Sequence, residues 1–112
     1  MTPNDYQEAA LKTAGAADAM TPDRAIYTAL GLAGEAGEVA NLTKKWQYHK
    51  HPYDRERFLD ELGDCLWYIS VNAHTHGYTL EEVMEYNIRK LKLRYPEGFS
   101  TSASINRKEN GN

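Results

Sequence analysis

The segment from Thr21 to about His49 most constrains the fold, because it reads as one long helix with apolar residues on two sides. At roughly 100° per residue, two opposite stripes emerge from its side chains. One stripe consists of Ile26, Leu30, Ala33, Gly37 and Ala40, and the other of Leu32, Val39, Leu42 and Trp46. A helix that is apolar on two faces packs between two partners. A chain of 112 residues must therefore supply or recruit helices for both sides.

Other segments also read as helices, and none alternates as a strand. The predicted helices run from Pro3 to about Gly15, from Pro22 to about His49, from Asp54 to His76, and from Thr79 to before Pro96. The pairs Thr2-Pro3 and Thr21-Pro22 predict the starts of the first two helices, and Gly77 predicts the end of the third. We expect an all-α domain over residues 1–99, a bundle of about four helices that oligomerises through helix packing. Residues 100–112 form a polar tail, either loosely ordered or docked on another subunit.

Composition excludes several function classes. The net charge is −3, so no basic field draws the chain to nucleic acid. A single cysteine, Cys65, rules out an internal disulfide and fits a reducing compartment. The N-terminus resembles no signal peptide, and the apolar stretch from Cys65 to Ala73 is too short for a bilayer. We expect a cytoplasmic protein without membrane or nucleic-acid partners.

Two acidic pairs carry the chemistry. Glu35 and Glu38 are three residues apart on the second predicted helix, and Glu61 and Asp64 are three apart on the third. Residues at this spacing are neighbours on a helix surface. If the two helices pack antiparallel through their apolar faces, the four carboxylates meet at the edge of a core. For any one such pair, a solvated helix face is the more common explanation.

Four clustered carboxylates need a cation, because repulsion and desolvation would otherwise protonate some of them. Oxygen ligands suit hard ions such as Mg²⁺, Mn²⁺ and Ca²⁺. Zinc is disfavoured because no Cys or His lies at ligand spacing. Mg²⁺ is commonly completed by substrate phosphates, which points from the metal to a nucleotide.

Cations and aromatic residues supply the rest of such a site. Asn87, Lys90 and Arg94 share one side of the fourth predicted helix and could hold phosphate, although a solvated face explains them too. Lys45 belongs to a second basic group, for which a helix C-terminal charge preference is the alternative. Trp46 shares the face of Glu35 and is the candidate for base stacking.

These residues resemble a known family. The segments GEAGEVANLTKKW, DELGDCLWYI and NIRKLKLRYPEGF are similar to the motifs of the MazG-like all-α nucleoside triphosphate pyrophosphatases. The resemblance covers roughly residues 22–99. It implies a dimer or tetramer with sites completed across subunits, and hydrolysis of a nucleoside triphosphate to the monophosphate and pyrophosphate, often to clear non-standard nucleotides.

The resemblance also implies roles for individual residues. Glu35, Glu38, Glu61 and Asp64 would bind Mg²⁺, with Mn²⁺ as a substitute, and Lys90, Arg94 and Asn87 would contact phosphate. Glu38, or Glu35 beside it, is the candidate to accept a proton from the attacking water.

Several alternatives stay open. Relatives of this fold cleave dUTP, dCTP or a phosphoribosyl-ATP, and the metal motif does not separate them. A non-catalytic helical oligomer that binds nucleotide is a second reading, and a structural bundle with incidental acids is a third.

Overall fold

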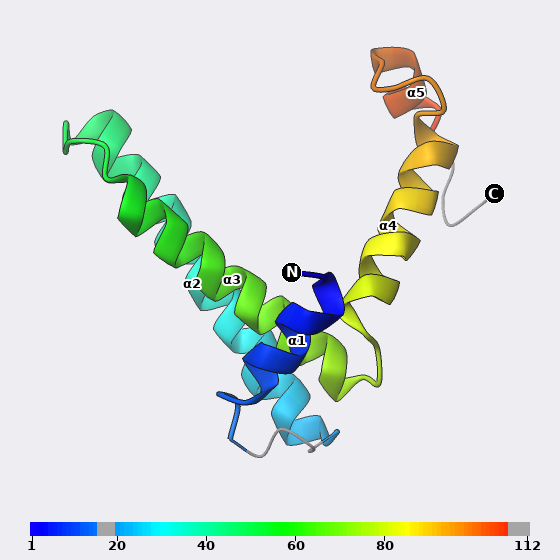
Figure 1. Cartoon of the computed structure of the whole chain (residues 1–112). Coiled ribbons are helices and arrows are strands. Elements are labelled where there is room, and N and C mark those ends of the chain that lie inside the picture. Colours follow the sequence, from blue (N-terminus) through cyan, green and yellow to red (C-terminus); the bar gives the residue numbers. More distant parts are fainter. Residues whose placement is uncertain (16–19, 108–112) are drawn as a thin grey trace.

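The computed structural model describes residues 1–15 and 20–107, and these ranges contain helices and no strand (Figure 1). The helices are α1 (Pro3–Leu11), α2 (Pro22–Tyr48), α3 (Arg55–Thr75), α4 (Leu80–Arg94) and α5 (Thr101–Ile105). The all-α prediction is confirmed, and the four predicted helices correspond to α1 through α4. α1 is shorter than predicted, since Lys12 is its C-cap and Gly15, with φ at +70°, lies beyond it.

Polar side chains start the helices where the sequence predicts. The Thr21 hydroxyl accepts a hydrogen bond from the backbone N–H of Arg24 at 3.3 Å, and Thr79 caps α4 in the same way. Asp54 caps α3 by accepting from the N–H of Arg57 at 3.2 Å. Each bond satisfies one of the backbone donors that a helix leaves free in its first turn.

The long helices form a V (Figure 1). α2 and α3 pack together as an antiparallel hairpin, which is one arm, and α4 projects as the other. α1 lies at the junction, where it contacts both α3 and α4. The two arms diverge, so the outer part of α4 stands apart from the hairpin.

The buried core is small and lies at the junction of the V. Ala10 of α1 and Ala14, which lies just beyond the end of α1, pack on Val71 of α3. Tyr6 and Trp67 are half-buried around them. One chain of this size buries a limited fraction of its surface. The core therefore fixes the junction and leaves the arms thinly supported.

Gln7 ties the three elements of the junction together. Its buried side-chain amide donates to the carbonyls of Ser70 and Tyr78, both at 3.1 Å. Its amide oxygen accepts from the backbone N–H of Leu80 at 3.1 Å. One side chain thus joins α1 to α3 and to the start of α4.

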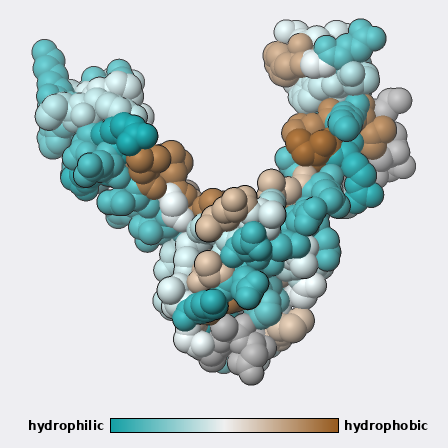
Figure 2. Space-filling model, viewed as in Figure 1, coloured by the Kyte–Doolittle hydropathy of each residue, from teal (hydrophilic) through white to brown (hydrophobic). Residues whose placement is uncertain are grey.

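Apolar side chains along both arms remain exposed. They include Leu59, Leu62, Leu66 and Ile69 on α3, and Met84, Ile88, Leu91 and Leu93 on α4. Figure 2 shows hydrophobic surface along both arms rather than only at their junction. The second apolar side of α2 is also open, with Ile26 58% and Leu30 69% exposed. The partner predicted for that side of α2 is not supplied by the described part of this chain.

The predicted polar tail contains a short helix. α5 is capped by Ser100, whose hydroxyl accepts from the N–H of Ala103 at 3.0 Å, and Ile105 is exposed. Residues 108–112 of that tail lie outside the described residues. No helix of the described ranges combines the length and apolar character needed to cross a membrane.

Candidate functional site

Three of the four predicted metal-binding acids meet on the hairpin. Glu35 of α2 and Glu61 and Asp64 of α3 each offer one carboxylate oxygen, and these oxygens lie within 4.8 Å of one another. Glu35 and Glu61 are half-buried, and Asp64 is exposed. We call these three residues the acidic cluster. Among the described residues, no other group of His, Cys, Asp and Glu meets the same criterion.

The register of the hairpin brings the acidic cluster together. Near the junction, the ring of Tyr68 lies against the backbone of α2 at Gly31, and near the tip Trp46 and Phe58 are 5.9 Å apart, centroid to centroid. Glu35 lies one turn beyond Gly31, and Asp64 lies one turn before Tyr68. Two antiparallel helices held at these contacts must place Glu35 opposite Asp64.

The neighbouring carboxylates of the acidic cluster disfavour ionisation of Glu35. Burial, a hydrogen bond with Glu61 and the charge of Asp64 raise the pKa of Glu35 above its ordinary 4.5. Smaller contributions come from the charges of Glu61 and Glu38. A hydrogen bond between two carboxyl groups requires a proton that a bound cation would replace. The donors are all oxygen, so the residues fit a hard divalent ion such as Mg²⁺.

Glu38 lies next to the acidic cluster rather than within it. It is exposed and one turn beyond Glu35 on α2. Its carboxylate is near enough to raise the pKa of Glu35, but it is not among the oxygens that converge. Its position suits a side chain that completes the shell of an ion or that contacts a water molecule beside it.

Aromatic residues line the junction side of the acidic cluster. Trp67 and Tyr68 border a hollow of about 300 Å³ together with Glu35 and Asp64. Trp67 also packs on the core, and its indole N–H donates to the hydroxyl of Thr13 at 2.8 Å. Trp67 therefore serves core packing and also borders this hollow.

Tyrosines from α1 and α2 complete this aromatic side, and sequence reasoning missed them. Tyr27 hydrogen-bonds Tyr68, and the rings are 6.3 Å apart. Burial, this bond and nearby acids raise the pKa of Tyr68, and burial and Asp64 raise the pKa of Tyr6. The approach of Tyr6 depends on how α1 packs, for which the sequence carries no local signal.

Trp46, the base-stacking candidate, is not in this hollow. It lies at the far end of the hairpin, where its ring is 5.0 Å from that of Tyr53 and 5.9 Å from that of Phe58. Eleven residues separate it from Glu35, which is about 16 Å of helix. Trp46 remains 38% exposed.

The predicted phosphate-binding residues divide between the two arms. Lys45 is half-buried on the hairpin near its tip. Asn87, Lys90 and Arg94 lie on α4, which diverges from the hairpin (Figure 1). A single chain therefore does not bring the three α4 residues to the acidic cluster.

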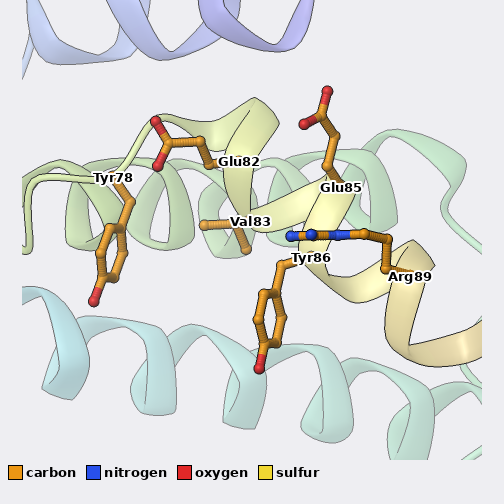
Figure 3. Close-up of a pocket in the computed structure, with 6 residues that line it drawn as sticks. All are labelled: Tyr78, Glu82, Val83, Glu85, Tyr86 and Arg89. Carbon is orange, nitrogen blue, oxygen red and sulfur yellow. The ribbon is translucent and has the colours of Figure 1, made fainter. Parts of the chain in front are cut away.

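A second hollow, of about 580 Å³, lies at the start of α4. Its lining consists of Tyr78, Glu82, Val83, Glu85, Tyr86 and Arg89. Figure 3 shows the rings of Tyr78 and Tyr86 extending to the same side of α4, with Val83 between them. This hollow is remote from the acidic cluster in sequence and belongs to the uncovered surface of α4.

Comparison with known proteins identifies the class to which the chain belongs. The family model for the MazG nucleotide pyrophosphohydrolase domain matches residues 25–99, which include the acidic cluster, Glu38 and α4. The chain therefore belongs to the MazG nucleotide pyrophosphohydrolase family, as its motifs predicted. It is similar to the Gene 37 protein of Mycobacterium phage L5, with 36% identity over 109 residues, 91% of this chain and 96% of the phage protein. No solved structure matches it.

Proposed function

We propose that this protein hydrolyses a nucleoside triphosphate to the monophosphate and pyrophosphate, with Mg²⁺ held by Glu35, Glu61 and Asp64 and completed by Glu38. The observation that carries the proposal is the acidic cluster, whose carboxylate oxygens lie within 4.8 Å of one another. Membership of a family of nucleotide pyrophosphohydrolases supports the same reaction.

The residues of the hairpin have separate roles in this proposed reaction. When bound, Mg²⁺ would neutralise phosphate charge and polarise the phosphorus under attack. Glu38 is exposed beside the acidic cluster, where it accepts a proton from the attacking water. Trp67 and Tyr68 restrict water on the junction side and offer ring faces to the nucleoside.

The same site supports narrower substrates, and the base preference is part of the proposal to be tested. A member specific for dUTP, dCTP or a phosphoribosyl-ATP would use the same acids. A non-catalytic nucleotide-binding oligomer would keep the metal but release no pyrophosphate.

A second copy of the chain would complete the site. Asn87 and Lys90 lie in the middle of the apolar surface of α4, between the side of Met84, Ile88 and Leu91 and that of Val83 and Tyr86. Whatever covers this surface also covers Asn87 and Lys90. A covered lysine needs an acidic or phosphate partner.

The lengths of the two arms suit such a partner. Lys90 lies ten residues beyond the start of α4, and Asp64 lies eleven residues before the end of α3, about 15 Å and 16 Å from the junction. In a dimer with a two-fold axis along the bisector of the V, α4 of one copy runs beside the hairpin of the other. Lys90 and Arg94 then come level with Asp64 and Glu61 and can contact phosphate there.

Pyrophosphate release from a panel of nucleoside triphosphates tests the proposal. We expect Mg²⁺-dependent release that Asp64→Asn abolishes and Glu38→Gln lowers by about a hundredfold or more, the usual contribution of a general base. Glu56→Gln, an exposed acid at the start of α3, is the matched control and should keep full activity. Absence of release from every nucleotide, with nucleotide still bound, would favour the non-catalytic oligomer.

A further inference from the structure

Positive charge is concentrated at the tip of the hairpin, although the chain as a whole is acidic. Residues 44–57 hold five of the 13 basic side chains and two of the 16 acidic ones. This segment therefore carries a charge of +3, and the rest of the chain carries −6. The net charge gave no reason to expect a nucleic-acid partner, but a local cluster of cations attracts phosphate whatever the average is.

The cations at the tip are open to solvent. Lys44, Lys50 and Arg55 are exposed, and within the described ranges no ion pair joins them to a carboxylate. Asp54, which lies among them, accepts a hydrogen bond from the backbone N–H of Arg57 as the cap of α3. The tip is the outer end of its arm, far from the junction (Figure 1). A ligand can therefore reach all three charges without displacing part of the described chain.

Aromatic rings alternate with these cations. Tyr48 is the last residue of α2 and is 81% exposed, and Tyr53 in the turn is 55% exposed. Tyr53 stacks on Phe58, with ring centroids 4.9 Å apart and planes inclined by 20°. This contact holds the ring of Tyr53 in place while more than half of the residue stays in solvent. An exposed ring in a fixed position is a platform on which a nucleic-acid base can stack.

A hollow adjoins Tyr48 on the open side of α2. It measures about 490 Å³ and is lined by Ala40, Thr43, Lys44, Gln47 and Tyr48. The apolar stripe of α2 ends at Ala40, so the hollow lies where polar side chains replace that stripe. Lys44 supplies a charge for phosphate, the Gln47 amide can bond the edge of a base, and Tyr48 supplies a ring. Each part of a nucleotide unit thus has a partner there.

The turn also places a lysine where glycine is usual. Lys50 follows the C-cap of α2 and has φ at +59°. The N–H groups on either side of it, from His49 and His51, both donate to the carbonyl of Lys45 at 3.1 Å. Helices often end with a residue in this left-handed conformation, and glycine is preferred because a side chain is strained there. Strain that is retained together with an exposed cation is typical of a functional position.

We propose that the tip of the hairpin binds single-stranded nucleic acid, with the phosphates on its exposed cations and the bases stacked on its tyrosines. The residues concerned form the tip surface, which consists of Lys44, Tyr48, Lys50, Tyr53 and Arg55. A single strand fits better than a duplex because its bases are free to stack on protein rings. Tyr48 lies ten residues beyond Glu38, about 15 Å of helix, so the tip surface is separate from the acidic cluster. The proposal stands whether or not the protein hydrolyses nucleotides.

Fluorescence anisotropy would measure the binding of the full-length protein to labelled oligonucleotides. The probes are oligothymidylate and oligouridylate of about ten nucleotides, within the range that one such surface covers. A chelator prevents metal ions from joining phosphate to the acidic cluster. We expect the wild type to bind with an affinity that falls as salt rises, and the tighter of the two strands identifies the nucleic acid. Tyr48→Ala should weaken binding about tenfold, as for the loss of one stacked base.

Lys50→Gly separates loss of the tip surface from loss of structure. Glycine removes the charge and relieves the left-handed backbone, so the melting temperature should stay the same or rise while the affinity falls. The slope of log affinity against log salt should become shallower by about 0.7, the contribution of one cation to binding a single strand. An unchanged affinity and an unchanged slope in this variant would overturn the proposal.

Tyr78→Ala and Lys12→Gln are the matched controls. They remove an exposed ring and an exposed charge from the other end of the molecule, and binding should be unchanged. Losses equal to those of the tip variants would overturn the proposal, and so would a duplex bound as tightly as the single strand, or a wild type that binds neither strand at low salt.

Two further measurements on Tyr48→Ala separate the tip surface from other roles. Pyrophosphate release from nucleoside triphosphates should be unchanged, because the tyrosine is remote from the acidic cluster, and a loss of release would overturn the separation of the two surfaces. Sedimentation velocity should also be unchanged. A shift to a smaller species would show instead that a second copy of the chain covers the tip.

Discussion

The ring of Tyr68 occupies the space that a side chain at Gly31 would need. A Cβ built on Gly31 would lie 2.6 Å from Cδ1 of Tyr68 and closer still to other atoms of the ring. The absence of a side chain at this position lets α2 and α3 approach, and it seats Tyr68 beside the acidic cluster. A Cβ built on Gly34 or on Gly37, in the same helix, would have no atom of a neighbouring element within 4 Å.

Gly31→Ala should therefore destabilise the protein, although alanine favours helix. We expect a loss of about 1–3 kcal/mol in the free energy of unfolding, as for overpacking of a filled contact. Gly34→Ala is the matched control and should gain up to about 1 kcal/mol from helix propensity. Thermal and denaturant unfolding would measure both, and equal stability of the two variants would contradict the close contact at Gly31.

Gln7→Met should weaken the junction of the V. The substitution keeps the volume but removes three hydrogen bonds, and it leaves the carbonyl of Tyr78 and the N–H of Leu80 without the side-chain partner that they have in the folded protein. We expect a loss of about 2–4 kcal/mol, because buried backbone groups would be left unsatisfied. Glu8→Gln, on the exposed side of α1, should change stability little. Denaturant unfolding followed by circular dichroism is the measurement, and an unchanged midpoint for Gln7→Met would argue against the junction.

The stability of the metal-free protein should fall as the pH rises. Burial, the bond with Glu61 and the neighbouring acids raise the pKa of Glu35 above 4.5 in the folded protein. The folded state then holds this proton to higher pH than the unfolded chain, so stability is lost as the pH rises from the unfolded value through the raised one. Mg²⁺ should oppose that loss, and it should raise the melting temperature more at about pH 8 than at about pH 5.

Glu35→Gln checks the source of that pH dependence. The amide cannot ionise, so the variant should lose both the decline in stability and most of the response to Mg²⁺. Melting curves across the pH range, with Mg²⁺ and with a chelator, would record the two effects together. A wild-type pH profile that Glu35→Gln leaves unchanged would assign the titration to another group.

Ile88→Lys should dissociate the oligomer. Ile88 is 50% exposed on the apolar surface of α4, and a lysine there would place an unpaired charge in the interface proposed above. Sedimentation velocity should show a dimer or larger species for the wild type and a monomer for the variant. Lys92→Gln, on the polar side of the same helix, should not change the sedimentation. A monomeric wild type would remove the basis for a site completed by a second copy.

Helix positions were predictable from the sequence because each start carries its own local signal. Thr21 and Thr79 act as caps through bonds to residues three positions away, and that spacing is readable without a structure. The pairing of Glu35 with Glu61 and Asp64 was predictable too, since apolar stripes define which faces of two adjacent helices meet.

The divergence of α4 was not predictable in the same way. It depends on Gln7 of α1 reaching Ser70 and Tyr78, a contact across more than sixty residues with no periodic signature. The position of Lys90 relative to the acidic cluster follows from the direction in which α4 leaves the junction. The sequence therefore predicted which face of α4 carries Lys90, but not that α4 would diverge from the hairpin. Trp46 lies outside the hollow because eleven residues of α2 separate it from Glu35.

The hairpin also bears on the order in which the molecule folds. Glu35 and Asp64 are joined through one short turn, so the loop that must close to bring them together is a small part of the chain. Contacts between neighbouring segments form early, whereas the bond from Gln7 to Leu80 must wait for distant segments to meet. We expect the carboxylates to be gathered while α1 and α4 are still unattached, so that a divalent ion could capture a folding intermediate before the junction exists.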